Sequence, residues 1–226
     1  MKLTLIKKIQ EAKDIYTFVF EPENPVTWKA GQYIFFKIPH ENPDDRGEIR
    51  HFTISSAPSE KNIFLTTKFD FENGSSFKKA LFKLNQGSSI EGFNLGGDFI
   101  LKDLKAKYIF IAGGIGITPY RSILMDLAHE GRLTDIILFY CGKADGIIFM
   151  DVFNEIKKKY KWPLIHFVIE PQLINEEIIK EKVPDLEDRI FYISGPMVMV
   201  RIAEEILLKL NIEKSNIVKD YFPGYG

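Results

Sequence analysis

Near the middle of the chain stands the stretch Tyr108-Ile109-Phe110-Ile111-Ala112-Gly113-Gly114-Ile115-Gly116-Ile117-Thr118-Pro119. Its first five residues form an apolar run, which predicts a buried strand, and a helical pattern continues after the glycines to about Ala128. Glycines let the backbone turn sharply, and unpaired N–H groups at a helix start attract anions. Strand, glycine loop and helix in this order are what a pyrophosphate site requires.

The same stretch also has a plain structural interpretation. Glycines after a strand permit a tight turn and close helix–sheet packing, and the spacing here differs from the G-x-G-x-x-G pattern of dinucleotide sites. Thr118 either caps the helix or donates to a phosphate, and Pro119 suits the first helical position. On this stretch alone, nucleotide binding and simple packing both stay open.

The sequence after this stretch repeats the alternation of strand and helix. Further apolar runs cover Asp135–Tyr140, Leu164–Ile169 and Ile190–Ser194, and a longer segment with helical spacing follows each of them. Runs that are buried on both faces and separated by helices predict a parallel, doubly wound sheet. We therefore assign residues 103–226 to an α/β domain.

The sequence before the glycine stretch has a different pattern of hydrophobic residues. Short β-branched and aromatic runs at Ile15–Phe20, Gln32–Ile38, Arg50–Ser56 and Asn62–Phe69 are separated by turn residues, and one short helix is expected after Asn73-Gly74-Ser75-Ser76. Closely spaced strands of this kind predict a small antiparallel β-barrel. We place the boundary between the two domains at residue 102.

Composition narrows the classes of protein. The 30 Lys and Arg residues are balanced by 31 Asp and Glu, so no overall field favours nucleic acid or an anionic membrane. Cys141, the only cysteine, excludes a disulfide framework and a four-thiolate metal site, and is interpreted as a small core residue. Without a signal-like or membrane-spanning run, a cytoplasmic protein with no metal centre is expected.

A second candidate site lies on the predicted strand Arg50-His51-Phe52-Thr53-Ile54-Ser55-Ser56. Alternation places Arg50, Phe52 and Ser56 on one face, which offers a phosphate clamp beside an aromatic platform. The helix that opens at Gly74-Ser75-Ser76 is a second anion site. The plainer interpretations are an edge-strand arginine with a core phenylalanine, and ordinary helix capping by a serine.

Taken together and in this order, these segments resemble the ferredoxin-NADP reductase superfamily over nearly the whole chain. The resemblance implies an N-terminal antiparallel Greek-key β-barrel that holds FAD, followed by a Rossmann-like doubly wound sheet that binds NADPH or NADH. Phe52 replaces a tyrosine that is usual in the family, and Ser194 replaces a frequent cysteine.

The resemblance also implies roles for particular residues on the flavin side. Arg50 binds the FAD pyrophosphate, Thr53 lies near flavin N5, and Ser75 or Ser76 is a phosphate ligand. The full set of flavin-binding residues is Arg50, His51, Phe52, Thr53, Ser56, Thr66, Thr67, Lys68, Gly74, Ser75 and Ser76.

On the nicotinamide side, the glycine loop is joined by Ser194-Gly195-Pro196-Met197-Val198-Met199 and by the C-terminal aromatic segment. The implied ligands are Gly113, Gly114, Gly116, Thr118, Pro119, Lys143, Gly195, Pro196, Met197, Phe222 and Tyr225, and the implied catalytic residues are Thr53, Ser194 and Phe222. Lys143 is the nearby cation that can pair with a 2′-phosphate. A plain helix start at Ser194–Pro196 and a surface-packed tail are the alternatives.

The function that follows from the resemblance is hydride transfer from NAD(P)H to FAD, with onward electron transfer to an external protein such as a ferredoxin or flavodoxin. The alternatives are an FAD-holding subunit of a larger oxidoreductase, a free-flavin or quinone reductase, and a flavin-free interaction module.

Overall fold

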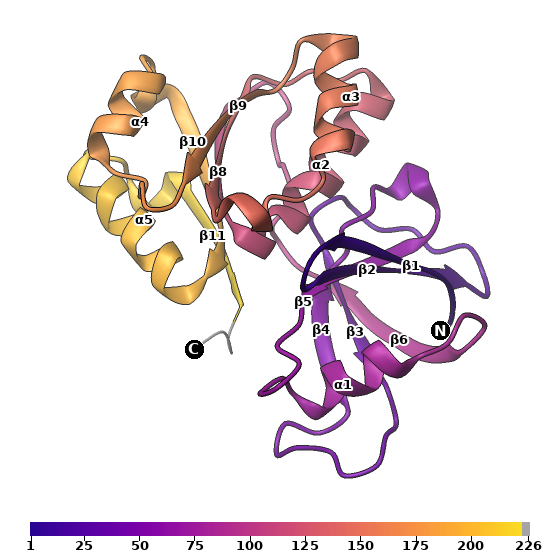
Figure 1. The fold of residues 1–226 in the computed structure, drawn as a ribbon. Helices are drawn as coiled ribbons and strands as arrows, with labels where there is room; N and C mark the ends of the chain where they lie inside the picture. Colours follow the sequence, from indigo (N-terminus) through magenta and orange to yellow (C-terminus); the bar gives the residue numbers. More distant parts are fainter. Residues whose placement is uncertain (223–226) are drawn as a thin grey trace.

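The first half of the chain forms a six-stranded antiparallel sheet with the strand order β4-β3-β6-β1-β2-β5. A bridge between Ile54 and Leu65 joins the two edges, so the sheet closes into a barrel. This is a computed structural model that describes residues 1–222 (Figure 1). The strands are β1 (Lys2–Ala12), β2 (Ile15–Pro22), β3 (Tyr33–Lys37), β4 (Ile49–Thr53), β5 (Ile63–Lys68) and β6 (Ser89–Gly96).

Four of these strands were expected from the sequence, and β1 and β6 were not. β1 has buried leucines at Leu3 and Leu5, but its register shifts between Leu5 and Lys7, which breaks the alternation that identifies a strand. β6 contains Gly92, where a Cβ would lie 2.6 Å from a Leu3 side-chain carbon. A glycine that weakens the strand pattern is therefore needed for close packing.

The second half forms a five-stranded parallel sheet with the order β11-β10-β7-β8-β9. The strands are β7 (Lys107–Gly113), β8 (Ile136–Gly142), β9 (Leu164–Ile169), β10 (Arg189–Pro196) and β11 (Ile217–Phe222). The helices are α1 (Ser76–Lys83) on the barrel, and α2 (Thr118–Glu130), α3 (Met150–Tyr160), α4 (Glu176–Lys182) and α5 (Met197–Lys209) on the sheet. Short 3-10 helices are η1 (Pro58–Glu60), η2 (Gly114–Ile117), η3 (Ala144–Gly146), η4 (Leu186–Asp188) and η5 (Lys214–Asn216).

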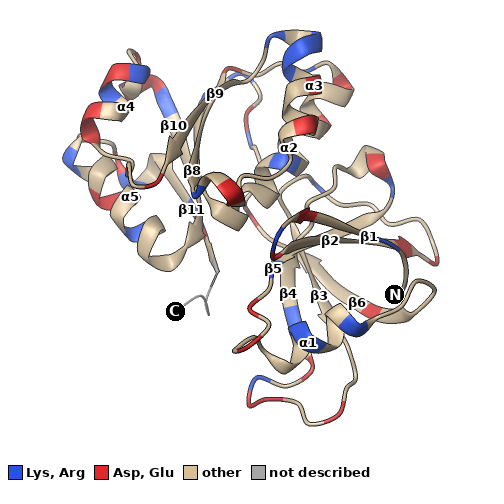
Figure 2. Ribbon diagram, in the orientation of Figure 1, with Lys and Arg blue, Asp and Glu red and all other residues tan. Residues whose placement is uncertain are grey.

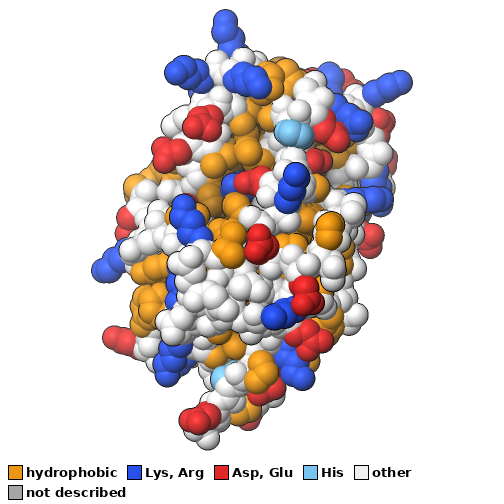
Figure 3. Space-filling view, turned by 90° about the vertical axis from the view of Figure 1, so that its right-hand side faces the viewer, with side chains coloured by type: hydrophobic (Ala, Val, Ile, Leu, Met, Phe, Trp, Pro, Cys, Tyr) orange, Lys and Arg blue, Asp and Glu red, His pale blue; other side chains and the backbone are white. Residues whose placement is uncertain are grey.

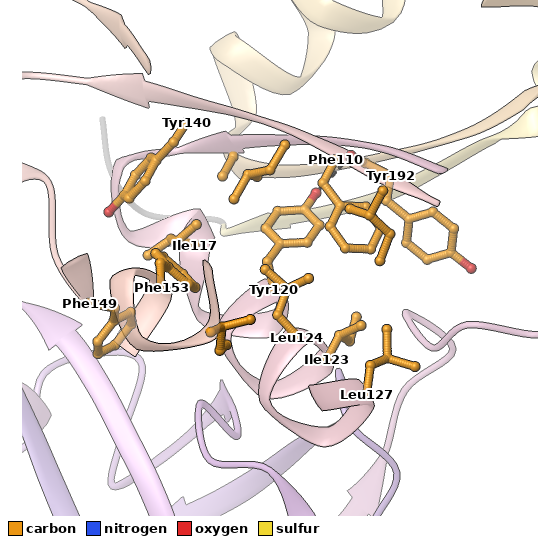
Figure 4. Close-up of a cluster of buried hydrophobic side chains, with 14 of the residues drawn as sticks. Phe110, Ile117, Tyr120, Ile123, Leu124, Leu127, Tyr140, Phe149, Phe153 and Tyr192 are labelled. Carbon is orange, nitrogen blue, oxygen red and sulfur yellow. Dashed lines mark hydrogen bonds between the residues drawn. The ribbon is translucent and has the colours of Figure 1, made fainter. Parts of the chain in front are cut away.

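Helices cover both faces of the parallel sheet, as the sequence predicts. One core lies under α2 and α3, where Phe110 and Tyr120 stack with ring centroids 4.6 Å apart beside Tyr192 (Figure 4). The opposite core contains Ile179 of α4 and Leu207 of α5. Among the described residues, no helix has the length and apolar character needed to cross a bilayer.

The barrel and the parallel sheet meet through α2. Arg121 donates from Nη1 to the Ser55 carbonyl at 2.7 Å and forms a two-point ion pair with Glu60. The Ser122 hydroxyl donates to the Ser56 carbonyl at 2.6 Å. Both acceptor carbonyls lie just beyond the end of β4, the strand that carries Arg50 and that we call the arginine strand. These contacts therefore attach the arginine strand to the helix that starts at the glycine loop.

Charge of both signs is mixed over the surface. On the face shown in Figure 3, Lys and Arg side chains lie among Asp and Glu side chains, with hydrophobic side chains between them. This pattern agrees with the formal net charge of -1. A binding site for a phosphate must therefore rest on a local arrangement of donors.

Candidate functional site

The glycine loop lies at the carboxyl end of β7, where it passes through η2 into α2. Gly114 has a φ of 51°, in the left-handed region that glycine adopts without strain. A Cβ on Gly116 would lie 2.2 Å from the Ser194 carbonyl oxygen. Glycine at this position lets the loop pack directly on the backbone of β10.

Thr118 does not cap α2, contrary to one expectation. The N-cap residue is Ile117, which makes no side-chain capping bond, and the buried Thr118 hydroxyl donates to the Ile115 carbonyl at 3.2 Å. The chain already turns as η2 before the α-helix begins, so the cap position falls one residue earlier. Pro119 does lie in the first turn, as expected.

Two further glycines lie at the carboxyl ends of neighbouring strands, beside the loop. Gly142 ends β8, and an added Cβ there would lie 3.7 Å from the Gly114 nitrogen. An added Cβ on Gly195, in β10, would lie 3.1 Å from the Gly113 Cα. Pro196 ends β10, and Met197 begins α5. At this carboxyl edge of the sheet, which we call the glycine edge, backbone atoms of Gly113, Gly142 and Gly195 lie close together. The exposed Lys143 lies just beyond β8.

The arginine strand presents a cationic and an aromatic side chain together. Arg50 and Phe52 both approach Phe77 of α1: the guanidinium carbon is 5.7 Å from the Phe77 ring centroid, and the Phe52 ring stacks at 5.8 Å. His51 points the other way and contacts Tyr33. The structure therefore brings Arg50 and Phe52 together and separates His51 from them.

Of the other predicted flavin-side residues, Ser56, Thr66 and Thr67 are buried, whereas Lys68 is exposed. Ser56 lies beyond the end of β4, and its fully buried hydroxyl donates to the Asn62 carbonyl, so the predicted alternation through Ser56 is wrong. Thr66 is also buried and shares hydrogen bonds with the Ser55 and Thr17 hydroxyls. Thr67 is buried beside it, and Lys68 forms an exposed ion pair with Asp14.

The start of α1 borders a large pocket. Ser75 is the N-cap, and its hydroxyl accepts a hydrogen bond from the Lys78 N–H, while Ser76 contacts Asp44 of the β3–β4 loop. The pocket has a volume of about 810 Å³, and Gly74, Ser75, Ser76 and Lys79 line one side of it. Ligand pockets in proteins are typically of this size.

Three side chains meet where the barrel and the parallel sheet come together. Thr53 ends β4, Ser194 lies near the end of β10, and Asp220 lies in β11 opposite Ser194. Burial is the largest effect on Asp220 and raises its pKa to about 6, although the Thr53 and Ser194 hydroxyls act to lower it. The buried Ser194 Oγ approaches Asp220 without forming a hydrogen bond to any described residue.

Asp220 was not identified from the sequence. Its role depends on β11, which was not recognised as a strand and was interpreted only as part of an aromatic tail. A carboxylate inside a short β-branched run, Ile217-Val218-Lys219-Asp220, is the signal that points to it.

Replacing Asp220 by asparagine is expected to remove a pH dependence of stability. The pKa in the folded chain is about 6, above the usual 3.8. The stabilisation linked to the protonated carboxyl is therefore complete below about pH 4 and lost as pH rises through about 6, roughly 3 kcal/mol in all. Urea unfolding at a series of pH values measures this loss in the original chain and its absence in Asp220→Asn.

The exposed Asp151 of α3 provides a matched control. Asp151→Asn should keep the pH profile of the original chain. Coincident profiles for Asp220→Asn and the original chain would contradict the prediction.

The remaining predictions concern Cys141 and the C-terminal aromatic residues Phe222 and Tyr225. Burial raises the pKa of the Cys141 thiol to about 12, which agrees with its interpretation as a packing residue. The backbone of Phe222 pairs with Pro196 at the end of β11. The side chain of Phe222 and the whole of Tyr225 lie outside the described residues.

Comparison with known proteins agrees with this arrangement. Residues 110–205 match a family model described as the oxidoreductase NAD-binding domain. The chain is 25% identical to flavohemoprotein A of Dictyostelium discoideum over 96% of this chain and 58% of the relative. The chain spans about half the length of the curated relatives that it matches.

Solved structures have the same two-part fold. The FAD/NAD-binding domain of a nitric oxide dioxygenase from Vibrio cholerae superposes with a TM-score of 0.80 at 20% identity, covering 98% of both chains. Ferredoxin-NADP+ reductase from Plasmodium falciparum gives a TM-score of 0.81 at 22% identity, covering 98% of this chain and 95% of its own. The match over residues 110–205 identifies an oxidoreductase NAD-binding domain, and the barrel with its glycine-lined parallel sheet has the fold of these two structures.

Proposed function

We propose that this chain is an NAD(P)H-dependent flavoprotein reductase that transfers a hydride to FAD and passes electrons to an external acceptor. The observation that carries the proposal is the meeting of Thr53, Ser194 and Asp220 between the arginine strand and the glycine loops. Residues 1–102 would hold the flavin, and residues 103–226 the dinucleotide.

The flavin side fits FAD. Arg50 supplies a planar fork of donors that suits a pyrophosphate, and the first turn of α1 supplies backbone N–H groups. The pocket of about 810 Å³ beside them provides room for the nucleotide part. Phe52 offers its ring for stacking, and Thr53 lies at the inner end of the same strand.

The nicotinamide side fits a dinucleotide. Gly113, Gly114 and Gly116 permit a close backbone approach, because a side chain on Gly116 would collide with β10. Gly195 and Pro196 continue the edge, and Ser194 brings an unpartnered hydroxyl to it. Pro119, Met197, Phe222 and Tyr225 complete the ligand set that we assign.

The cofactor supplies the redox chemistry when bound, and the protein supplies orientation and proton balance. Arg50 and α1 would anchor the pyrophosphate, and the glycine edge would hold the dinucleotide. With a pKa of about 6, Asp220 can hold or release a proton near neutral pH, and the neighbouring Thr53 hydroxyl favours its charged form. The hydrogen bonds of Arg121 and Ser122 to the segment after β4 hold the barrel and the parallel sheet together, and with them these groups.

The electron acceptor is proposed to be a small redox protein such as a ferredoxin or flavodoxin. The chain has one cysteine, so it does not supply the thiolates of an iron–sulfur cluster by itself. The alternatives, an FAD-holding subunit and a free-flavin reductase, differ in how the chain responds to NAD(P)H and in how tightly it holds flavin.

The proposal is tested by recording the visible spectrum of the chain loaded with FAD and adding NADH or NADPH without oxygen. We expect the flavin absorbance to bleach. If Lys143 binds a 2′-phosphate, Lys143→Ala should raise the KM for NADPH about 10-fold and leave that for NADH unchanged.

The exposed Lys161 at the end of α3 gives the matched control, because Lys161→Ala removes the same charge away from the glycine edge. A flavin bleached by neither nucleotide would favour the FAD-holding subunit. A chain that takes up no FAD would overturn the proposed function.

A further inference from the structure

The β3–β4 loop places a carboxylate directly on the start of α1. The Ser76 N–H donates to Asp44 Oδ2 at 2.9 Å, and the Asp44 N–H donates to Ser76 Oγ at 2.8 Å. Residue 76 is in the first turn of α1, where backbone N–H groups lack partners within the helix. Asp44 therefore occupies a position at which a helix favours an anion.

The same carboxylate also holds Arg50. Arg50 Nη2 donates to Asp44 Oδ1 at 2.9 Å, and the two side chains are 17% and 31% exposed. Arg50 Nη1 donates separately to the carbonyls of Arg46, Gly47 and Ile49. These backbone carbonyls hold the guanidinium in addition to its bond with Asp44.

Asp44 is held in its charged form. Burial is the largest effect and alone would raise the pKa of Asp44, but hydrogen bonds from Ser76 and Arg46 and the charge of Arg50 lower it below its usual value. One oxygen of this anion faces the helix and the other faces the guanidinium. A phosphate bridging the same two donors would present its oxygens in the same way.

The pocket beside these contacts includes the loop as one wall. Asp44, Asp45 and Arg46 line it opposite Gly74 and Lys79. Figure 2 shows acidic and basic residues together on this loop below α1. Each N–H hydrogen satisfies one strong acceptor at a time, so the Ser76 N–H and the Arg50 Nη2 hydrogen that bind Asp44 cannot also bind a pyrophosphate.

We propose that Asp44 is an internal competitor for the FAD pyrophosphate and sets the affinity of the chain for its flavin. This inference rests on the proposed function. FAD binds by displacing the Asp44 carboxylate from Ser76 and Arg50, and the β3–β4 loop moves with it. Flavin is consequently held more weakly, and exchanged faster, than the donors alone would allow.

The test compares Asp44→Asn with the original chain and with Asp45→Asn. Asp45 is an exposed neighbour on the same loop, so its substitution makes the same change in charge and controls for long-range electrostatics. FAD affinity is measured by the quenching of flavin fluorescence, and ADP is the second probe because it carries a pyrophosphate without a flavin.

Asp44→Asn is expected to lower the Kd for FAD and for ADP about 10-fold relative to Asp45→Asn. A second readout is the melting temperature: without added ligand it should fall, because the ion pair is lost, while the rise caused by saturating FAD should become larger.

An equal or weaker affinity in Asp44→Asn, with FAD still bound by the original chain, would overturn this inference alone and make Asp44 a positioning residue for Arg50. Failure of the original chain and both variants to bind FAD would overturn the proposed function and this inference together.

Discussion

Replacement of Arg121 by alanine is expected to destabilise the chain by about 3–5 kcal/mol, because it leaves the partner carboxylate in a largely desolvated interface. The Arg121 side chain is 7% exposed and pairs with Glu60 at 2.7 and 2.9 Å. Its guanidinium carbon also lies 5.1 Å from the Phe64 ring centroid and 5.2 Å from that of Phe149. These contacts join elements of both halves.

Urea unfolding measures this loss, and Arg132→Ala provides the matched control. Arg132 forms an exposed ion pair with Glu130 just after α2, with side chains 57% and 41% exposed, and its removal should cost less than about 1 kcal/mol. A double-mutant cycle with Glu60→Ala should give a coupling energy well above that of the surface pair. Equal losses for Arg121→Ala and Arg132→Ala would refute the structural role of the interface.

Gly116→Ala is expected to reduce the affinity for the nicotinamide dinucleotide by about 10-fold or more. The added Cβ would lie 2.2 Å from the Ser194 carbonyl oxygen, 2.5 Å from its carbonyl carbon and 2.7 Å from the Gly195 Cα. All three are backbone atoms, so η2 or β10 must shift, and such overpacking costs about 1–3 kcal/mol in stability. The shift would disturb both sides of the proposed nicotinamide site.

Gly146→Ala is the control for this substitution. Gly146 lies in η3 beyond β8, and an added Cβ there would meet no atom of the chain within 4 Å. The free energy of unfolding of Gly146→Ala should differ from that of the original chain by no more than about 0.5 kcal/mol. Titration with NADH and NADPH, together with urea unfolding, compares the two variants. Unchanged nucleotide affinity in Gly116→Ala would remove the glycine loop from the proposed site.

The sequence predicted most strands because their burial is simple. Tyr108–Ala112 is an uninterrupted apolar run, Leu164–Ile169 is interrupted only by His166, and both became strands of the parallel sheet. β1 escaped detection because its bulge breaks the alternation, and β11 because its run includes Lys219 and Asp220. β11 pairs only with β10 and is mixed in polarity, and such an edge strand leaves only a weak pattern in the sequence.

Local sequence also determined the chemistry of two candidate sites. The glycine loop and the Arg50 strand could be identified because each depends on a few adjacent residues, whose backbone freedom or donors are evident from residue type. Phe222 and Tyr225 remain assignments from the family resemblance, and their roles are still predictions.

Contacts between residues far apart in the chain depend on how its elements pack. Asp220 lies 167 residues after Thr53 in the sequence. It reaches Thr53 because parallel pairing of β11 with β10 carries it to the junction of the two sheets. Asp44 reaches Arg50 and Ser76 because the barrel brings the β3–β4 loop to α1. Such contacts depend on strand order and loop path, whereas a buried strand or a glycine turn is determined by side chains within a few residues of one another.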